Sequence, residues 1–170
     1  ENAAVALDVN DIRFFDVGDY PLDLGHDTQD RMVDVIREVQ PKFMMSHSKW
    51  DPYNTDHMDT TQFALQCRMI AQAWGHNPGE KVLGAPQMYL FEPHQTKQME
   101  WKPTIFLDIT DVWDKKWAAI QCMKGQEHLC FGCRRPKPRK KDGLCRLQVH
   151  EQVNVVEFTY EDDQPLTLPG

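Results

Sequence analysis

Short apolar runs alternate with longer amphipathic stretches along most of this sequence. The runs are rich in aromatic and β-branched residues and cover residues 12–15, 42–46, 87–91 and 104–109. They are too short for helices and lack polar alternation, which is typical of strands buried on both faces.

Between the runs, apolar residues recur at helical spacing, and residues 1–7 also have a helical pattern. Capping-type pairs, Asp27-Thr28 and Thr110-Asp111, precede two of these stripes. Strands that alternate with helices predict an α/β fold with a mostly parallel sheet covered by helices. The stripes consist of Met32, Ile36 and Val39; Phe63, Cys67, Ile70 and Trp74; and Trp113, Trp117 and Ile120.

The composition is that of an ordinary globular domain, with 170 residues of which 41% are hydrophobic and 26% charged. No apolar run approaches the ~18 residues of a membrane span, so we expect no membrane partner. The net charge of −7 argues against a dedicated nucleic-acid binder. Five cysteines, an odd number, favour reduced thiols and a cytoplasmic location over a disulfide framework.

The composition changes after Leu129. Residues 130–150 are rich in lysine and arginine, whereas residues 151–170 contain neither. The spacing of three cysteines and a histidine in this region is similar to that of a small zinc module, and the basic run suggests nucleic-acid contact. These residues are Cys130, Cys133, Cys145 and His150.

The abrupt changes of charge and the break inside a helical pattern favour another interpretation, a shifted or rearranged gene end. We therefore expect residues 1–129 to form a partial α/β domain and residues 130–170 to be a divergent, poorly ordered tail. The sequence begins at Glu1, within a helical pattern, and we expect it to be an N-terminally truncated fragment.

Each predicted strand runs into a polar cluster, and ligands of open α/β sheets bind beyond the carboxyl ends of the strands. The richest stretch runs from His47 to His57 and holds two imidazoles and two carboxylates. Zinc binds imidazole nitrogen and carboxylate oxygen, so this stretch is a candidate metal site. The alternative, left open by the spacing, is that Asp56 caps the following helix and His57 is a partly exposed residue of its first turn.

Several separated blocks resemble the LmbE-like (PIG-L) superfamily of zinc enzymes, and within it the branch of 4-oxalomesaconate hydratases. The blocks lie at residues 14–22, 46–57, 78–86, 91–95, 100–103, 106–110, 112–116, 118–123 and 125–129. The resemblance implies a Rossmann-like, three-layer α/β/α fold and a hydro-lyase that adds water to a small oxo-carboxylate in gallate or protocatechuate breakdown.

The resemblance also implies a Zn²⁺ cofactor with His57 as a metal ligand and Asp56 beside it, supporting the ligand without touching the metal. The family's other two ligands come from a His-x-x-Asp motif after its first strand, and no such motif precedes residue 12. We therefore expect the fragment alone to be unstable and inactive, with the oligomeric state, including a homo-oligomer, left open.

Deacetylases of this family usually have His-Pro-Asp-His where this sequence has Asn54-Thr-Asp-His57. An amide side chain cannot act as an acid or base near neutral pH, which disfavours amide hydrolysis and is tolerable for hydration of an activated alkene. The alternatives are an N-deacetylase acting on an N-acetylglucosamine-type substrate, an inactive remnant and, more distantly, a binding module built on the basic tail.

We expect the catalytic residues to be Glu92 and His94, with Asp19 and His47 behind them. Tyr53, Asn54 and Lys49 are candidates for substrate binding. A carboxylate substrate requires a positive contact, for which Lys49, Lys97 and Lys102 are available, and the sequence does not choose among them.

Overall fold

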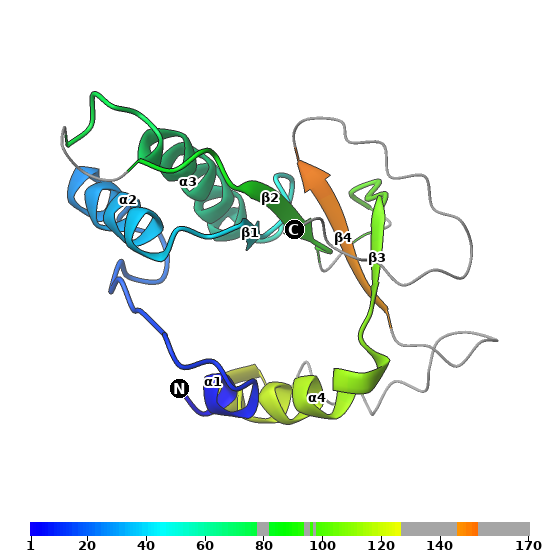
Figure 1. The fold of residues 1–170 in the computed structure, drawn as a ribbon. Helices are drawn as coiled ribbons and strands as arrows, with labels where there is room; N and C mark the ends of the chain where they lie inside the picture. The colour runs from blue at the N-terminus through cyan, green and yellow to red at the C-terminus, as the bar shows by residue number, and fades with distance from the viewer. Residues whose placement is uncertain (78–81, 94–95, 97, 127–145, 153–170) are drawn as a thin grey trace. The chain divides into compact units, whose positions relative to one another are not determined.

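The computed structural model describes residues 1–77, 82–93, 96, 98–126 and 146–152 (Figure 1). The chain divides into two compact units. The first comprises residues 1–15 and 106–147, and the second comprises residues 16–105 and 148–170. Among the described residues, no helix is both long enough and apolar enough to cross a membrane.

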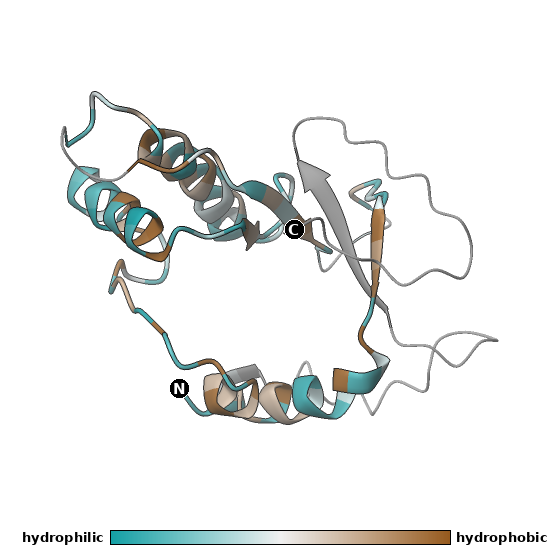
Figure 2. Ribbon diagram, viewed as in Figure 1, coloured by the Kyte–Doolittle hydropathy of each residue, from teal (hydrophilic) through white to brown (hydrophobic). Residues whose placement is uncertain are grey.

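In the second unit, helix α2 (His26–Val39) packs against helix α3 (Thr55–Ala71) (Figure 1). Polar and apolar residues alternate around α2 (Figure 2), so one stripe of the helix can be buried. This stripe contributes Val33 and Ile36 to a core cluster with Phe63 and Cys67 of α3. Each such side chain stabilises the fold by roughly 1.5–3 kcal/mol when fully buried.

Strands β1 (Phe43–Ser46) and β2 (Gln87–Phe91) pair in parallel, with Phe43 opposite Gln87 and Ser46 opposite Leu90. The connection between them contains α3, whose Ala64 packs against Met88 and Leu90 of β2. In such a β-α-β unit the strands end at the edge of the sheet where the helix begins. The unit therefore brings the residues after β1, the first turn of α3 and the residues after β2 to one edge.

Strand β4 (Arg146–Gln152) pairs antiparallel with β2, with Leu90 opposite His150. It lies within the stretch predicted to be a poorly ordered tail. The rest of that stretch, and the predicted boundary between residues 129 and 130, lie outside the described residues.

In the first unit, the short helix α1 (Asn2–Ala6) packs against α4 (Trp113–Gln121), and Lys115 pairs with Asp8. Strand β3 (Ile105–Asp108) begins at the boundary between the units and leads into the 3-10 turn η1 (Thr110–Val112). The chain continues from α4 into a second turn, η2 (Lys124–Gln126).

The predicted α/β class is confirmed, and the strands predicted at 42–46, 87–91 and 104–109 are present as β1, β2 and β3. The strand predicted at 12–15 is wrong, because the described chain has no strand at these positions. Ile12 and Phe14 are 46% and 59% exposed, and Arg13 pairs with Asp11 two residues earlier. A strand requires a neighbour across which its backbone hydrogen bonds form a ladder, and an apolar run does not by itself provide one.

The predicted helix ends also need correction. Helix α2 has Gly25 at its N-cap, so Asp27 and Thr28 lie inside the helix. The N-cap of α4 is Val112, because the Thr110-Asp111 pair belongs to the preceding 3-10 turn. Propensity alone places helix starts within a few residues at best.

Helix α3 ends at Ala71, so Trp74 lies beyond it and is 75% exposed rather than part of the apolar stripe. The buried side chain of Arg37 explains this end. Its Nε donates to the carbonyl of Ala71 at 3.0 Å, and its Nη2 donates to the carbonyls of Ala73 at 3.0 Å and His76 at 2.8 Å. A cation at this position also complements the negative end of the helix dipole.

We predict that Arg37→Met lowers the free energy of unfolding by about 3 kcal/mol, because hydrogen bonds from a charged donor contribute roughly 1.5–3 kcal/mol each and removal of a buried charge offsets part of the loss. Urea unfolding followed by circular dichroism measures this. The matched control is Arg31→Met, at an exposed position of the same helix, which is expected to change stability by less than about 0.5 kcal/mol. Equal losses in the two variants would contradict the role of Arg37.

Candidate active site around His57

Two histidines meet at the edge of the sheet where β1 ends and α3 begins. His47 directly follows β1, and His57 lies in the first turn of α3. Their rings stack with centroids 3.9 Å apart and an interplanar angle of 11°. The pairing of His47 with His57 across a ten-residue segment is the structural basis of the site.

The fully buried carboxylate of Asp51 lies beside His57. Its Oδ2 is 2.9 Å from Nδ1 of His57. The side-chain nitrogen of Asn54 donates to both carboxylate oxygens at 3.2 Å, and the backbone N–H of Tyr53 donates to Oδ1 at 3.3 Å. The backbone N–H of Asn54 also donates to the carbonyl of Asp51 at 3.1 Å. Residues 51–54 therefore form a turn whose polar groups bind the Asp51 side chain.

These contacts determine the protonation state of Asp51. Burial raises the pKa of its carboxyl group, but the hydrogen bonds from His57 and Asn54 outweigh burial and hold the pKa below its ordinary value. The carboxylate is therefore ionised at neutral pH and can only accept hydrogen bonds. It follows that Nδ1 of His57 carries the proton of this bond, which leaves Nε2 as the ring nitrogen that can offer a lone pair.

The ring of His47 has a second aromatic neighbour besides His57. Its ring meets the ring of Phe91, the last residue of β2, edge to face at 4.6 Å. Burial lowers the pKa of His47, and the adjacent His57 lowers it further, while Asp56 and Asp51 act in the opposite direction. The neutral imidazole is thereby favoured at this position.

The side chain of Thr61 joins α3 to the end of β1 through hydrogen bonds. It is fully buried and lies one helical turn after His57, on the same face of the helix. Its hydroxyl donates to the carbonyl of His47 at 2.9 Å, and it shares a 2.8 Å hydrogen bond with the hydroxyl of Ser46. The backbone after β1 is thus bonded to the helix that carries His57.

The arrangement of Asp51 and His57 fits one ligand of a metal site. Metal-binding histidines usually donate their second ring N–H to a carboxylate, which fixes the tautomer and turns the free nitrogen towards the metal. Among the described residues, no group of three His, Cys, Asp or Glu side chains is placed to hold a metal ion. The described part of the chain therefore offers one oriented imidazole.

The carboxylate bonded to His57 is that of Asp51, and the supporting role that the resemblance implies for Asp56 stays a prediction. Neighbouring positions on a helix point in different directions, so Asp56 cannot lie along the ring of His57 in the same way. Asp56 is also not the helix cap, because the N-cap of α3 is Asn54.

The structure brings some of the other predicted site residues to the same edge. Asn54 binds Asp51, whereas the side chain of Tyr53 is 62% exposed and contributes through its backbone. Asp19 is exposed, and the next residue, Tyr20, shares a hydrogen bond with Thr55 at the start of α3.

Glu92 is exposed directly after β2, and Lys49 lies in the loop after His47. His94 lies outside the described residues. The catalytic roles of Glu92, Asp19 and His94 therefore stay predictions.

Sequence reasoning missed the roles of Asp51 and Thr61. The position of Thr61, four residues after His57, was an available signal for a side chain on the same helix face. For Asp51 the signal was weaker, because only the turn from Asp51 to Asn54 brings its carboxylate back to the helix.

We predict that Asp51→Ala lowers the free energy of unfolding by about 2 kcal/mol at pH 7, because it leaves the partly buried donors of Tyr53, Asn54 and His57 without their acceptor. Thermal and urea unfolding measure the change. The control is Asp59→Ala, at an exposed position of α3, with an expected change below about 0.5 kcal/mol. A stability unaffected by loss of Asp51 would show that its bonds do not organise the segment.

Comparison with known proteins places this geometry in a family. A model of the PIG-L family, described as GlcNAc-PI de-N-acetylase, matches residues 1–68. The 4-oxalmesaconate hydratase of Pseudomonas putida KT2440 is 60% identical over 118 residues, which are 69% of this chain and 46% of the hydratase. The matched part thus spans about half the length of that curated relative.

Two solved structures of low sequence identity share the fold. The first is the conserved protein TT1542 from Thermus thermophilus, with a TM-score of 0.67, 12% identity and coverage of 95% of this chain and 74% of that one. The second is the N,N'-diacetylchitobiose deacetylase from Pyrococcus horikoshii. The deacetylase has a TM-score of 0.68, 19% identity and coverage of 88% of this chain and 60% of its own.

A third solved structure is that of GalB, the 4-carboxy-2-hydroxymuconate hydratase of Pseudomonas putida KT2440. It matches with a TM-score of 0.79 and 44% identity, and the match covers 94% of this chain and 71% of GalB. Identity at this level over more than two thirds of GalB, together with the family match at residues 1–68, shows that this chain belongs to the PIG-L (LmbE-like) family.

Proposed function

We propose that the protein, expressed from its complete reading frame, is a zinc-dependent hydratase that adds water to 4-oxalomesaconate in gallate or protocatechuate breakdown. The observation that carries the proposal is the Asp51–His57–His47 arrangement, in a chain that is 60% identical over 118 residues to a protein named 4-oxalmesaconate hydratase. A small oxo-carboxylate is the proposed partner, and no nucleic acid is required.

In this proposal Nε2 of His57 is a zinc ligand, and residues other than those described complete the coordination. Bound zinc would polarise the substrate carbonyl that is conjugated to the double bond. The role of the protein chain is to fix the imidazole, since the buried Asp51 carboxylate holds its tautomer and orientation.

Hydration forms a C–O bond from water to one alkene carbon and places a proton on the other, so the site needs a group that takes a proton and one that returns it. His47 is the proposed proton carrier nearest to His57, because the two rings stack. Glu92 is the second candidate, one residue beyond Phe91, whose ring touches His47. Both belong to side-chain types that carry protons in general acid–base catalysis.

The engagement of Asn54 favours hydration over amide hydrolysis. Its side-chain amide donates hydrogen bonds to the Asp51 carboxylate. An amide is not an acid near neutral pH, so it cannot protonate a departing amine. The rival proposals are an N-deacetylase, which the description of the family model supports, and a remnant without activity.

We further propose a cytoplasmic enzyme. The thiol of Cys67 is free and buried between α2 and α3, and burial raises its pKa to about 11. A thiol with so high a pKa is protonated and inert at neutral pH, as expected of a cysteine with a packing role rather than a redox role.

The test is an assay of the complete protein with Zn²⁺, following the loss of absorbance of the conjugated substrate as water adds. We expect hydration that stops on chelation of zinc, a loss of about 100-fold or more in His57→Ala, and a loss of roughly 10- to 100-fold in Asp51→Asn, because the hydrogen-bond partners of metal-binding histidines contribute that much to metal sites.

The matched control is His26→Ala, an exposed histidine at the start of α2, which is expected to retain activity. Hydration that survives His57→Ala would contradict the proposal. Release of acetate from an N-acetylglucosamine-type substrate without hydration would favour the deacetylase, and the absence of both activities would favour the remnant.

A further inference from the structure

A cavity of about 300 Å³ lies within the second unit, beside the loop that follows β1. Its walls come from that loop, from the end of β2 and from the segment between Met99 and Lys102. Small-molecule sites in proteins begin at about this volume, so the cavity is large enough for part or all of a small organic acid.

The charged groups of this cavity are mainly cationic, although the chain as a whole carries a net charge of −7. Lys49 and Lys102 line it together with one carboxylate, that of Glu100. Neither lysine forms an ion pair with a side chain in the described part of the chain. Two exposed ammonium groups that line one hollow make it attractive to an anion.

Two tryptophan side chains form apolar parts of the cavity wall. Trp50 is 59% exposed, whereas Trp101 packs against Ala64, Met88 and Leu90 in the core. Indole faces bury flat carbon skeletons well. The cavity thus pairs cationic groups with apolar walls, which suits an organic polycarboxylate better than inorganic phosphate.

The segment that carries Trp101 and Lys102 is fixed in place. The backbone N–H of Trp101 donates to the carbonyl of Thr96 at 3.1 Å, and the Trp101 side chain packs against the core. On the opposite wall, the hydroxyl of Ser48 donates to the carbonyl of Trp50 at 3.0 Å and accepts from its N–H at 3.2 Å. Both walls are therefore held by bonds within the chain, and a wall fixed in this way reduces the entropy cost of binding.

Two residues that line the cavity are sequence neighbours of the rings around His47. Ser48 follows His47, and Leu90 precedes Phe91, whose ring contacts His47.

We propose that this cavity, defined by Lys49, Lys102, Trp50 and Trp101, binds a carboxylate group and the adjoining carbon chain of a di- or tricarboxylic acid. The proposal rests on the proposed function for the identity of the acid. The sequence left Lys49, Lys97 and Lys102 as equal candidates for a positive contact, and the cavity selects Lys49 with Lys102.

The experiment is isothermal titration of the complete protein with citrate, acetate and inorganic phosphate at constant ionic strength. Citrate is expected to bind, and to bind more tightly than either acetate or phosphate. Lys49→Gln and Lys102→Gln are each expected to weaken citrate binding about two- to fivefold, as the contribution of one exposed ion pair converts to a change of about fivefold or less. The double variant is expected to weaken it further.

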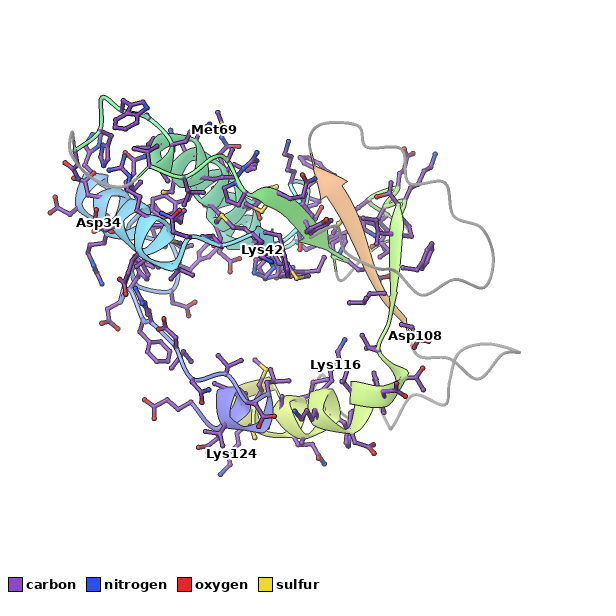
Figure 3. All side chains as sticks on the ribbon, viewed as in Figure 1. Asp34, Lys42, Met69, Asp108, Lys116 and Lys124 are labelled. Carbon is purple, nitrogen blue, oxygen red and sulfur yellow. The ribbon has the colours of Figure 1, made fainter. Side chains whose placement is uncertain are left out.

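The matched control is Lys42→Gln, an exposed lysine of the same unit just before β1 and labelled in Figure 3, which is expected to bind citrate like the parent protein. All three lysines are at exposed positions, and thermal unfolding checks that each variant is folded. Absent citrate binding, phosphate binding as tight as citrate binding, or equal effects of Lys42→Gln and the cavity variants would overturn the proposal.

Failure of this proposal can be distinguished from failure of the proposed function, because citrate binding requires no turnover. In the hydration assay, the cavity variants are expected to raise KM more than they lower kcat. Unchanged KM and citrate affinity with intact hydration would overturn the cavity alone. Lysine-dependent citrate binding without hydration would overturn the hydratase and leave the cavity.

Discussion

The site depends on one buried negative charge, the carboxylate of Asp51. An ionised carboxylate removed from water costs several kcal/mol unless donors replace its hydration. Here the donors are the side chains of His57 and Asn54 and the backbone N–H of Tyr53. The same bonds that compensate for burial of the charge also determine the orientation of His57.

The β1-α3-β2 unit provides a firm support for this cluster. At the start of α3, Thr61 bonds the helix to the backbone of His47. At its end, Arg37 binds the carbonyls released by the last turn. A helix fixed at both ends keeps the stacked rings of His47 and His57 in register, which a catalytic geometry requires to within about half an ångström.

The local parts of the fold were predictable from the sequence. The pattern of apolar residues located β1, β2, α2 and α3. The predicted α2 stripe was only partly correct, because Val39 is 51% exposed and Val33, which it omitted, is fully buried. The strand predicted at residues 12–15 was wrong because a strand is defined by its neighbour, which no local pattern reports.

Longer-range contacts account for the other differences. The end of α3 is set by Arg37, which lies 34 residues before Ala71. The local spacing of apolar residues, which placed Trp74 in the helix, contains no information about such a distant contact. In the candidate site, the chain segment and the two histidines were predictable from residue types. The partner of His57 was not, because the choice between Asp51 and Asp56 depends on the turn that brings Asp51 back to the helix.

The central claim is that Asp51 holds His57 as the tautomer protonated on Nδ1, with Nε2 free to bind a metal. The most direct measurement is ¹⁵N NMR of the imidazole nitrogens in the complete protein without metal, at a pH high enough for the imidazole rings to be neutral. The account predicts a protonated Nδ1 and an unprotonated Nε2 for His57, with that pattern lost in Asp51→Ala. A His57 ring protonated on Nε2, or one that is indifferent to the loss of Asp51, would contradict it.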